Sequence, residues 1–174
     1  MSLPGGAARL HLRLGATKVE VECPRGTARE AHQIVAGMLG LEQDAAAFAR
    51  LAARLGFARL VAGREGLRIS LTPSVFAGLL WAILGQQINF PFACRLKRRL
   101  FEHCGTRVGD TLFAPPTPEA VARLSIGDLL PLQFSKQKAG YVIAAARLIA
   151  EGGLKLDELR THRPANMSPR ATRR

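Results

Sequence analysis

Two adjacent glutamines that follow a long apolar segment are the residues best suited to act on another molecule. Gln86 and Gln87 come directly after Gly85, and Ile88 and Asn89 complete the segment. A glutamine amide carries both donor and acceptor groups, so it can bind base edges or an orphaned base. A loop between two helices is also a suitable place from which to insert a side chain into a duplex. The alternative is a polar helix end whose amides make only local capping hydrogen bonds.

Two lysines and a tyrosine further along the sequence could also meet nucleic acid. Lys136 and Lys138 stand at the start of a predicted helix, where an ammonium group can contact a DNA phosphate. Tyr141 falls on the polar side of the same helix, so its ring is available for stacking on a base. Phosphate contacts are blind to base sequence, so the lysines would contribute affinity rather than selectivity.

An arginine-rich stretch downstream of the glutamines has two interpretations. Arg95, Arg98 and Arg99 recur on one side of a predicted helix and could contact phosphates. Glu102 lies within one helical turn of Arg98 and Arg99, which favours ion pairs on a solvated helix face. We therefore do not count these arginines among the predicted DNA contacts.

The net charge indicates a polyanionic partner. The 174 residues include 25 Lys and Arg against 13 Asp and Glu, a formal charge of +12. Such a surface attracts DNA, RNA or an anionic membrane, and a generically basic protein is the alternative. The apolar run 75–84 is too short to span a bilayer, so no membrane segment is predicted.

The cysteines predict neither a metal site nor a disulfide framework. Cys23, Cys94 and Cys104 form no CxxC pair and no Cys-His cluster with zinc spacing. Buried thiols in a reducing cytoplasm are therefore expected, with no metal and no cofactor. No signal peptide is recognised at the start of the sequence, which also favours the cytoplasm.

The front of the sequence predicts a small β-structure followed by helices. Apolar residues alternate between positions 9 and 23, which is typical of a β-hairpin with one apolar face. Apolar residues at helical spacing predict helices over 27–40 and 43–55. Thr27 and Glu30 form a capping-box pattern at the start of the first helix.

The middle of the sequence is helical. Thr72-Pro73 predicts a helix start, and 75–85 has no strongly polar side chain, so this helix belongs in the centre of a bundle. Further helices are predicted over 92–104, from 117, over 126–131 and over 136–151, and the last three are predicted to be capped by Thr117, Ser125 and Ser135. Residues 161–174 lose the periodicity, carry four Arg and no acidic residue, and are predicted to be a disordered basic tail.

Three blocks of residues stand in a particular order along this region. The first is Thr72-Pro73 with Phe76 and Trp81-Ala82-Ile83-Leu84-Gly85-Gln86-Gln87-Ile88. The second is Pro116-Thr117-Pro118-Glu119-Ala120, and the third is Phe134-Ser135-Lys136-Gln137-Lys138-Ala139 before an Ala-rich helix. In this order, with similar gaps and over about residues 36–160, they resemble the helical core of the DNA-3-methyladenine glycosylase II family. Each block alone is weakly specific, whereas the ordered set is fairly specific.

The resemblance implies a helix-hairpin-helix glycosylase, whose members hydrolyse the N-glycosidic bond of alkylated purines after flipping the base out of the duplex. Gln87 matches the family position that fills the gap left by the flipped base, where some relatives carry a bulky apolar residue. Gln86 matches the position at the entrance of the base pocket. The family pattern continues to a Gly-rich hairpin that holds a phosphate and to a catalytic aspartate, which have no counterpart here. Asp128 and Asp157 lie in other contexts, so no catalytic residue is assigned.

The sequence therefore predicts a mainly α-helical protein, an incomplete bundle of the helix-hairpin-helix glycosylase type with a small N-terminal β-hairpin. Residues 1–66 are expected to be the remnant of an α+β domain, 67–160 the first part of the helical core, and 161–174 the tail. The expected partner is double-stranded DNA with alkylated bases, bound by a cytoplasmic monomer without metal, cofactor or membrane. The predicted DNA-binding residues are Gln86, Gln87, Ile88, Asn89, Lys136 and Lys138.

Little or no glycosylase activity is expected from this chain alone, because the resemblance stops before the catalytic segment. Two alternatives remain open from the sequence. One is a non-catalytic helical module that binds nucleic acid by charge, and the other is a non-functional product of a truncated or frame-shifted gene.

Overall fold

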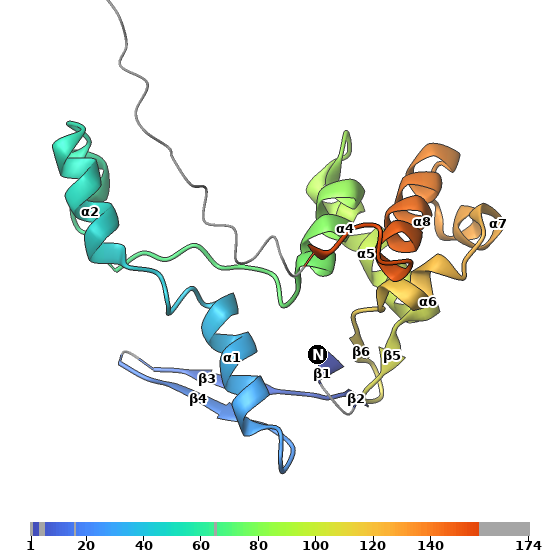
Figure 1. Cartoon of the computed structure of the whole chain (residues 1–174), viewed down its shortest axis with the longest axis horizontal. Coiled ribbons are helices and arrows are strands. Elements are labelled where there is room, and N and C mark those ends of the chain that lie inside the picture. The colour runs from blue at the N-terminus through green and yellow to red at the C-terminus, as the bar shows by residue number, and fades with distance from the viewer. Residues whose placement is uncertain (1, 4–5, 16, 65, 157–174) are drawn as a thin grey trace, which may run out of the picture. The chain divides into compact units, whose positions relative to one another are not determined.

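The computed structural model describes residues 2–3, 6–15, 17–64 and 66–156, which fall into two units, one of mixed strands and helices and one mainly helical (Figure 1). The first contains residues up to Ser74 together with Thr106–Pro115, and the second contains Val75–Gly105 and the residues from Pro116. This division differs from the predicted boundary at 66/67, because Ile69 and Leu71 are hydrogen-bonded back to residues 43 and 38. The predicted basic tail lies outside the described residues.

The first unit combines three pairs of short antiparallel strands with three helices. The strand pairs are β1 (Ser2–Leu3) with β2 (Gly6–Ala7), β3 (His11–Leu14) with β4 (Val19–Glu22), and β5 (Thr106–Arg107) with β6 (Phe113–Ala114). The helices are α1 (Ala28–Met38), α2 (Ala45–Arg54) and α3 (Ala58–Val61). The predicted hairpin and the two predicted helices are confirmed. The short helix α3 and the β1–β2 and β5–β6 pairs were not predicted.

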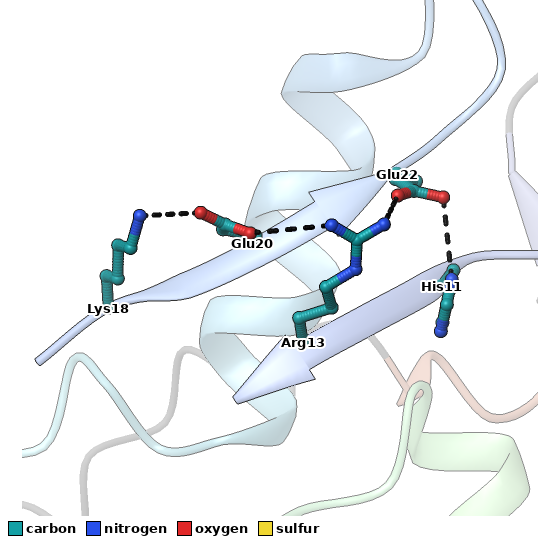
Figure 2. A network of polar contacts seen from close by, with 5 residues as sticks. All are labelled: His11, Arg13, Lys18, Glu20 and Glu22. Atoms are coloured by element: carbon teal, nitrogen blue, oxygen red, sulfur yellow. Dashed lines mark hydrogen bonds and ion pairs between the residues drawn. The ribbon is translucent and has the colours of Figure 1, made fainter. Parts of the chain in front are cut away.

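The β3–β4 hairpin has one apolar and one charged face, as its alternating sequence predicts. Its half-buried side chains are Leu12, Val19 and Val21. Figure 2 shows the other face, where Arg13 contacts both Glu20 and Glu22 across the two strands. His11 Nδ1 lies 3.4 Å from Glu22 Oε2, and Lys18 Nζ lies 2.6 Å from Glu20 Oε1. Because all five side chains are exposed, each pair contributes at most about 1 kcal/mol.

The capping box predicted at the start of α1 is wrong. Thr27 makes no side-chain bond to the helix, and its ψ of 12° is not the extended backbone of an N-cap. Its Oγ1 donates to the carbonyl of Pro24 at 2.8 Å instead, within the turn that precedes the helix. The start of α2 is capped by Asp44, whose Oδ1 accepts the N–H of Ala47 at 2.8 Å. Aspartate is a common N-cap residue.

The second unit is a bundle of helices around α8. Its elements are α4 (Val75–Gly85), α5 (Phe90–Cys104), α6 (Pro118–Ala122), α7 (Ile126–Leu129), the 3-10 turn η1 (Leu130–Leu132) and α8 (Lys136–Ala150). Helix α8 packs against α4, α6 and α7, and α4 packs against α5. Every predicted helix is present. Helix α4 begins only at Val75, since the hydroxyl of Thr72 donates to the carbonyl of Ser74 rather than capping the helix.

The core of the second unit follows the apolar pattern of the sequence. Leu80 and Leu84 of α4 meet Leu96 and Leu100 of α5 and Val142 of α8, and all five are at most 2% exposed. Burying a side chain of this size contributes roughly 1.5–3 kcal/mol. This packing fixes the end of α4 and the start of α5, and thereby the ends of the segment 86–89 between them. No helix in the described part of the chain is long and apolar enough to cross a membrane.

The cysteines of α5 differ in surroundings, and we expect them to differ in reactivity. The predicted burial is wrong for Cys94, which is exposed. Cys104 is half-buried, donates to the carbonyl of Leu100, and has its pKa raised to about 11 by burial. At pH 8 only about one Cys104 thiol in a thousand would be the reactive thiolate. Iodoacetamide at pH 8, followed by peptide mass spectrometry, should therefore modify Cys94 well before Cys104. The variant Cys94→Ser should lose that fast phase, and equal rates at the two residues would contradict the prediction.

Candidate nucleic-acid interface

The loop between α4 and α5 presents both glutamines at the surface. Gln86 and Gln87 are exposed, whereas the side chain of Ile88 packs against the core of the second unit. Gln87 has a φ of 57°, in the left-handed region that costs a residue other than glycine roughly 1–2 kcal/mol. The chain therefore places a long side chain at a turn position where glycine would adopt the same backbone conformation at lower energy. Backbone strain of this kind is concentrated at functional sites.

Asn89 ends the loop by capping α5. Its Oδ1 accepts the N–H of Phe92 at 2.9 Å, which satisfies one of the unpaired donors at the start of the helix. Asn89 was predicted to contact DNA, and the structure shows that its side-chain oxygen already has a capping partner. A further role in DNA binding stays a prediction.

Lys138 of α8 holds the end of α4 from the other side. Its Nζ donates to the carbonyl oxygens of Ile83 at 2.8 Å, Leu84 at 3.1 Å and Gln86 at 3.1 Å. An ammonium group has three N–H donors, so these three bonds use all of them. They satisfy carbonyls at a helix end, where the helix dipole also favours a positive charge. Desolvation lowers the pKa of Lys138 from its ordinary value.

A pocket of about 310 Å³ opens beside this loop. Its lining residues are Gln86, Gln87, Ile88, Ser135, Gln137, Lys138 and Tyr141. The pocket therefore joins the α4–α5 loop to the first turns of α8, which Figure 1 shows in the same bundle. Within it, Gln137 Nε2 donates to Tyr141 Oη at 2.8 Å, and both side chains are exposed. The lining offers amide, hydroxyl and aromatic groups, which suit a nucleobase.

Lys136 lies at the start of α8, next to the pocket. Ser135 Oγ caps this helix by accepting the N–H of Lys138 at 3.1 Å. The start of a helix carries a partial positive charge and unpaired N–H groups, which attract anions such as phosphate. The side chain of Lys136 is exposed and has no partner among the residues with a described placement. It is therefore the lysine of this helix that is free to meet DNA.

The structure gathers most of the predicted residues around one pocket. Gln86, Gln87, Ile88 and Lys138 line it, while Asn89 and Lys136 are on neighbouring positions of the chain. Sequence analysis did not single out Ser135 as a lining residue, and it missed Gln137. The spacing of four residues between Gln137 and Tyr141 places them on one helix face and could have revealed the pair.

Three of the four acidic side chains in the described part of the second unit have other partners. Asp128 Oδ2 accepts the N–H and the hydroxyl of Ser125, and these bonds lower its pKa. The pKa of Glu119 is lowered by bonds to its own backbone N–H and to the hydroxyl of Thr117. Glu102 Oε1 accepts from Arg98 Nε at 2.7 Å, which raises the pKa of Arg98. The described part of this unit also contains Glu151, and none of the four lines the pocket.

Cations of the second unit are also engaged at other backbone carbonyls. Arg147 donates to the carbonyls of Ala122 and Leu124 at the end of α6, and Arg99 donates to the carbonyl of Leu132. The predicted pairing of Glu102 is therefore confirmed for Arg98 only. Across the described ranges, no group of three or more His, Cys, Asp or Glu side chains is placed to hold a metal ion.

Comparison with known proteins identifies relatives over about half of this chain. Over 97 residues the chain is 38% identical to the DNA-3-methyladenine glycosylase of Bacillus subtilis (strain 168), covering 54% of this chain and 32% of that protein. A second protein of that organism is 42% identical over 94 residues, with the same coverage. The chain thus spans about a third of the length of the curated relatives it matches.

Solved structures show the same fold. MBOgg1 in complex with a low-affinity DNA ligand superimposes with a TM-score of 0.70 at 17% identity, covering 90% of this chain and 55% of that chain. The 3-methyladenine DNA-glycosylase from Archaeoglobus fulgidus gives a TM-score of 0.61 at 25% identity, covering 74% and 46%. Residues 80–172, more than half of the sequence, match the family described as HhH-GPD superfamily base excision DNA repair protein. The chain therefore belongs to the HhH-GPD superfamily of base excision DNA repair proteins.

Proposed function

We propose that this chain recognises damaged duplex DNA, as the lesion-binding part of a base excision repair protein that acts on alkylated bases. The observation that carries the proposal is the exposed side chain of Gln87, which lines the pocket from a left-handed turn. A side chain held in this way can enter the gap that a displaced base leaves in the stack. The names of the Bacillus subtilis and Archaeoglobus fulgidus relatives support alkylated adenine as the lesion class.

The positions of the cations support the proposal that the pocket side of the second unit meets the DNA backbone. Lys136 and the start of α8 offer a free ammonium and unpaired backbone N–H groups beside the pocket. The cations of α5 are engaged elsewhere: Arg98 pairs with Glu102, and Lys97 lies over the rings of Trp81 and Phe101. Phosphate contact therefore falls to the start of α8 rather than to α5.

The described residues supply binding rather than bond cleavage in this proposal. A carboxylate close to the sugar stabilises the oxocarbenium-like transition state of glycosidic hydrolysis. No carboxylate lines the described pocket, and Asp157 lies outside the described residues. We therefore propose that the 174-residue chain alone binds lesions and releases little or no 3-methyladenine from alkylated DNA.

Binding to a fluorescein-labelled duplex tests the proposal. By anisotropy over a potassium chloride series, the chain should bind a duplex with one abasic-site analogue about tenfold or more tightly than the intact duplex. The variant Gln87→Gly should lose most of this preference, because it removes the inserted side chain. Since glycine accepts the left-handed turn, the same variant should be as stable as the wild type or more stable, by up to about 1 kcal/mol in thermal melts.

Gln133→Gly is the matched control for that variant. Gln133 is also exposed and also has a positive φ, 70°, but it lies at the end of η1 and outside the pocket lining. It should gain similar stability and keep the wild-type preference for the abasic duplex. The proposal fails if the wild type binds both duplexes equally or if Gln87→Gly keeps the full preference. Release of 3-methyladenine at a rate near that of a complete relative would contradict the assignment of binding without cleavage.

A further inference from the structure

We propose that Lys138 is a positioning residue for lesion recognition, setting the conformation of the Gln86–Gln87 turn through three backbone carbonyls rather than contacting a DNA phosphate. The inference rests on the proposed function, because it concerns the same loop. It also changes the role that the sequence assigns to this lysine. The three bonds, from Nζ to the carbonyls of Ile83, Leu84 and Gln86, are 2.8, 3.1 and 3.1 Å long.

The hydrogen bonds of Lys138 connect α8 to the end of α4 and to the following turn, which are far apart in the sequence. Two of its acceptors lie in the last turn of α4, and the third is the carbonyl of Gln86, immediately before Gln87. The turn is also held by a backbone bond from the Gln86 N–H to Ile83, which is long at 3.4 Å, by the packing of Ile88 on the core, and by Asn89 at the start of α5. A bond of that length constrains the backbone weakly. The bond from Lys138 to the preceding carbonyl is therefore the shorter of the two described hydrogen bonds that hold the Gln86 backbone next to Gln87.

The three bonds made by the Lys138 ammonium group argue against direct contact of this lysine with a DNA phosphate. Lys138 is partly buried and all three of its donors are used, so a phosphate would have to displace a carbonyl to bind. Lys136, two residues earlier on the same helix, is exposed and without a described partner. The two lysines in the first turn of α8 therefore have different roles. Lys136 contacts phosphate, and Lys138 sets the conformation of the Gln86–Gln87 turn.

Three variants separate these roles in the anisotropy assay. Lys138→Met keeps the apolar stem but removes the donors, so the preference for the abasic duplex should fall about tenfold while the salt dependence of binding stays unchanged. Lys136→Met should weaken binding to both duplexes equally and reduce the slope of log K against log salt by about 0.9. Arg147→Met is the control for loss of a cap, because Arg147 binds carbonyls at the end of α6 outside the pocket. It should lower stability and leave the preference intact.

Amide hydrogen exchange without DNA gives an independent readout of the turn. The N–H of Gln86 keeps its bond to the Ile83 carbonyl only while the turn is held, so it should exchange faster in Lys138→Met than in the wild type or in Arg147→Met. Unchanged exchange, or a lower salt slope with an unchanged preference, would overturn the inference. If the wild type itself shows no preference, the proposed function fails, and faster exchange in Lys138→Met alone would still support Lys138 as the positioning residue of this turn.

Discussion

Replacing Leu100 by alanine is expected to lower the free energy of unfolding of the second unit by about 2–5 kcal/mol, a large part of the stability of a small domain. Leu100 is fully buried in α5, within the core cluster formed by α4, α5 and α8. Removing its branched end leaves a cavity that the surrounding helices fill only in part, so both the lost burial and the cavity cost stability. The loss also loosens the packing that fixes both ends of the glutamine loop.

Urea denaturation followed by tryptophan fluorescence measures this effect. Trp81 is the single tryptophan of the chain and lies in α4, so its emission reports on the second unit. Leu148→Ala in α8 is the control, because Leu148 is 48% exposed and its truncation should cost less than about 1 kcal/mol. Similar losses in the two variants would show that Leu100 is not part of a tightly packed core.

The second large effect is expected at Gly40 in the first unit. Gly40 has a φ of 63°, and a Cβ there would lie 2.9 Å from the carbonyl oxygen of Ile69 and 2.6 Å from Gln43 Nε2. The amide of Gln43 is held in place, since it donates to the carbonyl of Ile69 at 2.9 Å and accepts the N–H of Ile69 at 3.2 Å. Gly40→Ala therefore combines left-handed strain with a steric clash, and we expect a cost of about 2–5 kcal/mol.

Hydrogen exchange at two amides shows where that cost falls. The N–H groups of Ile69 and Leu71 bond to the Gln43 side chain and to the carbonyl of Met38, and both should lose protection in Gly40→Ala. Gly56→Ala isolates the backbone strain, because Gly56 has a φ of 82° and nothing lies within 4 Å of an added Cβ. That control should leave both amides protected. Equal exchange in the two variants would mean that the clash at Gly40 is relieved without cost.

Much of the fold was predictable because its signals are local. Thr117 and Ser135 cap α6 and α8 as predicted, since an N-cap side chain and its N–H partner lie three residues apart. The apolar segment 75–85 forms the helix α4, with the α5 stripe of Leu96 and Leu100 in the same core. The ordered blocks along the middle of the chain indicated a helix-hairpin-helix glycosylase, and the match to the HhH-GPD superfamily of base excision DNA repair proteins confirms that superfamily.

Local sequence patterns did not predict the details of two helix ends, because groups outside the helix determine the backbone there. The capping box at Thr27 was lost to the carbonyl of Pro24 in the preceding turn. Glycine at 85 marks the end of α4, yet the left-handed residue is Gln87, two positions later. The sequence shows which residue types are present at a helix end, but the path of the chain there depends on what packs against it.

The sequence by itself determined the helices, the caps of α6 and α8, the apolar core and the superfamily, because these depend on periodicity and on groups within one helical turn. Only the tertiary structure decided which groups lie near Lys136 and Lys138. Both are cations in the first turn of α8, and the sequence treats them alike. Packing of α8 against α4 brings Lys138 to carbonyls more than fifty residues earlier in the chain, while Lys136 faces solvent. The partner of a side chain at that sequence distance is set by how the helices pack.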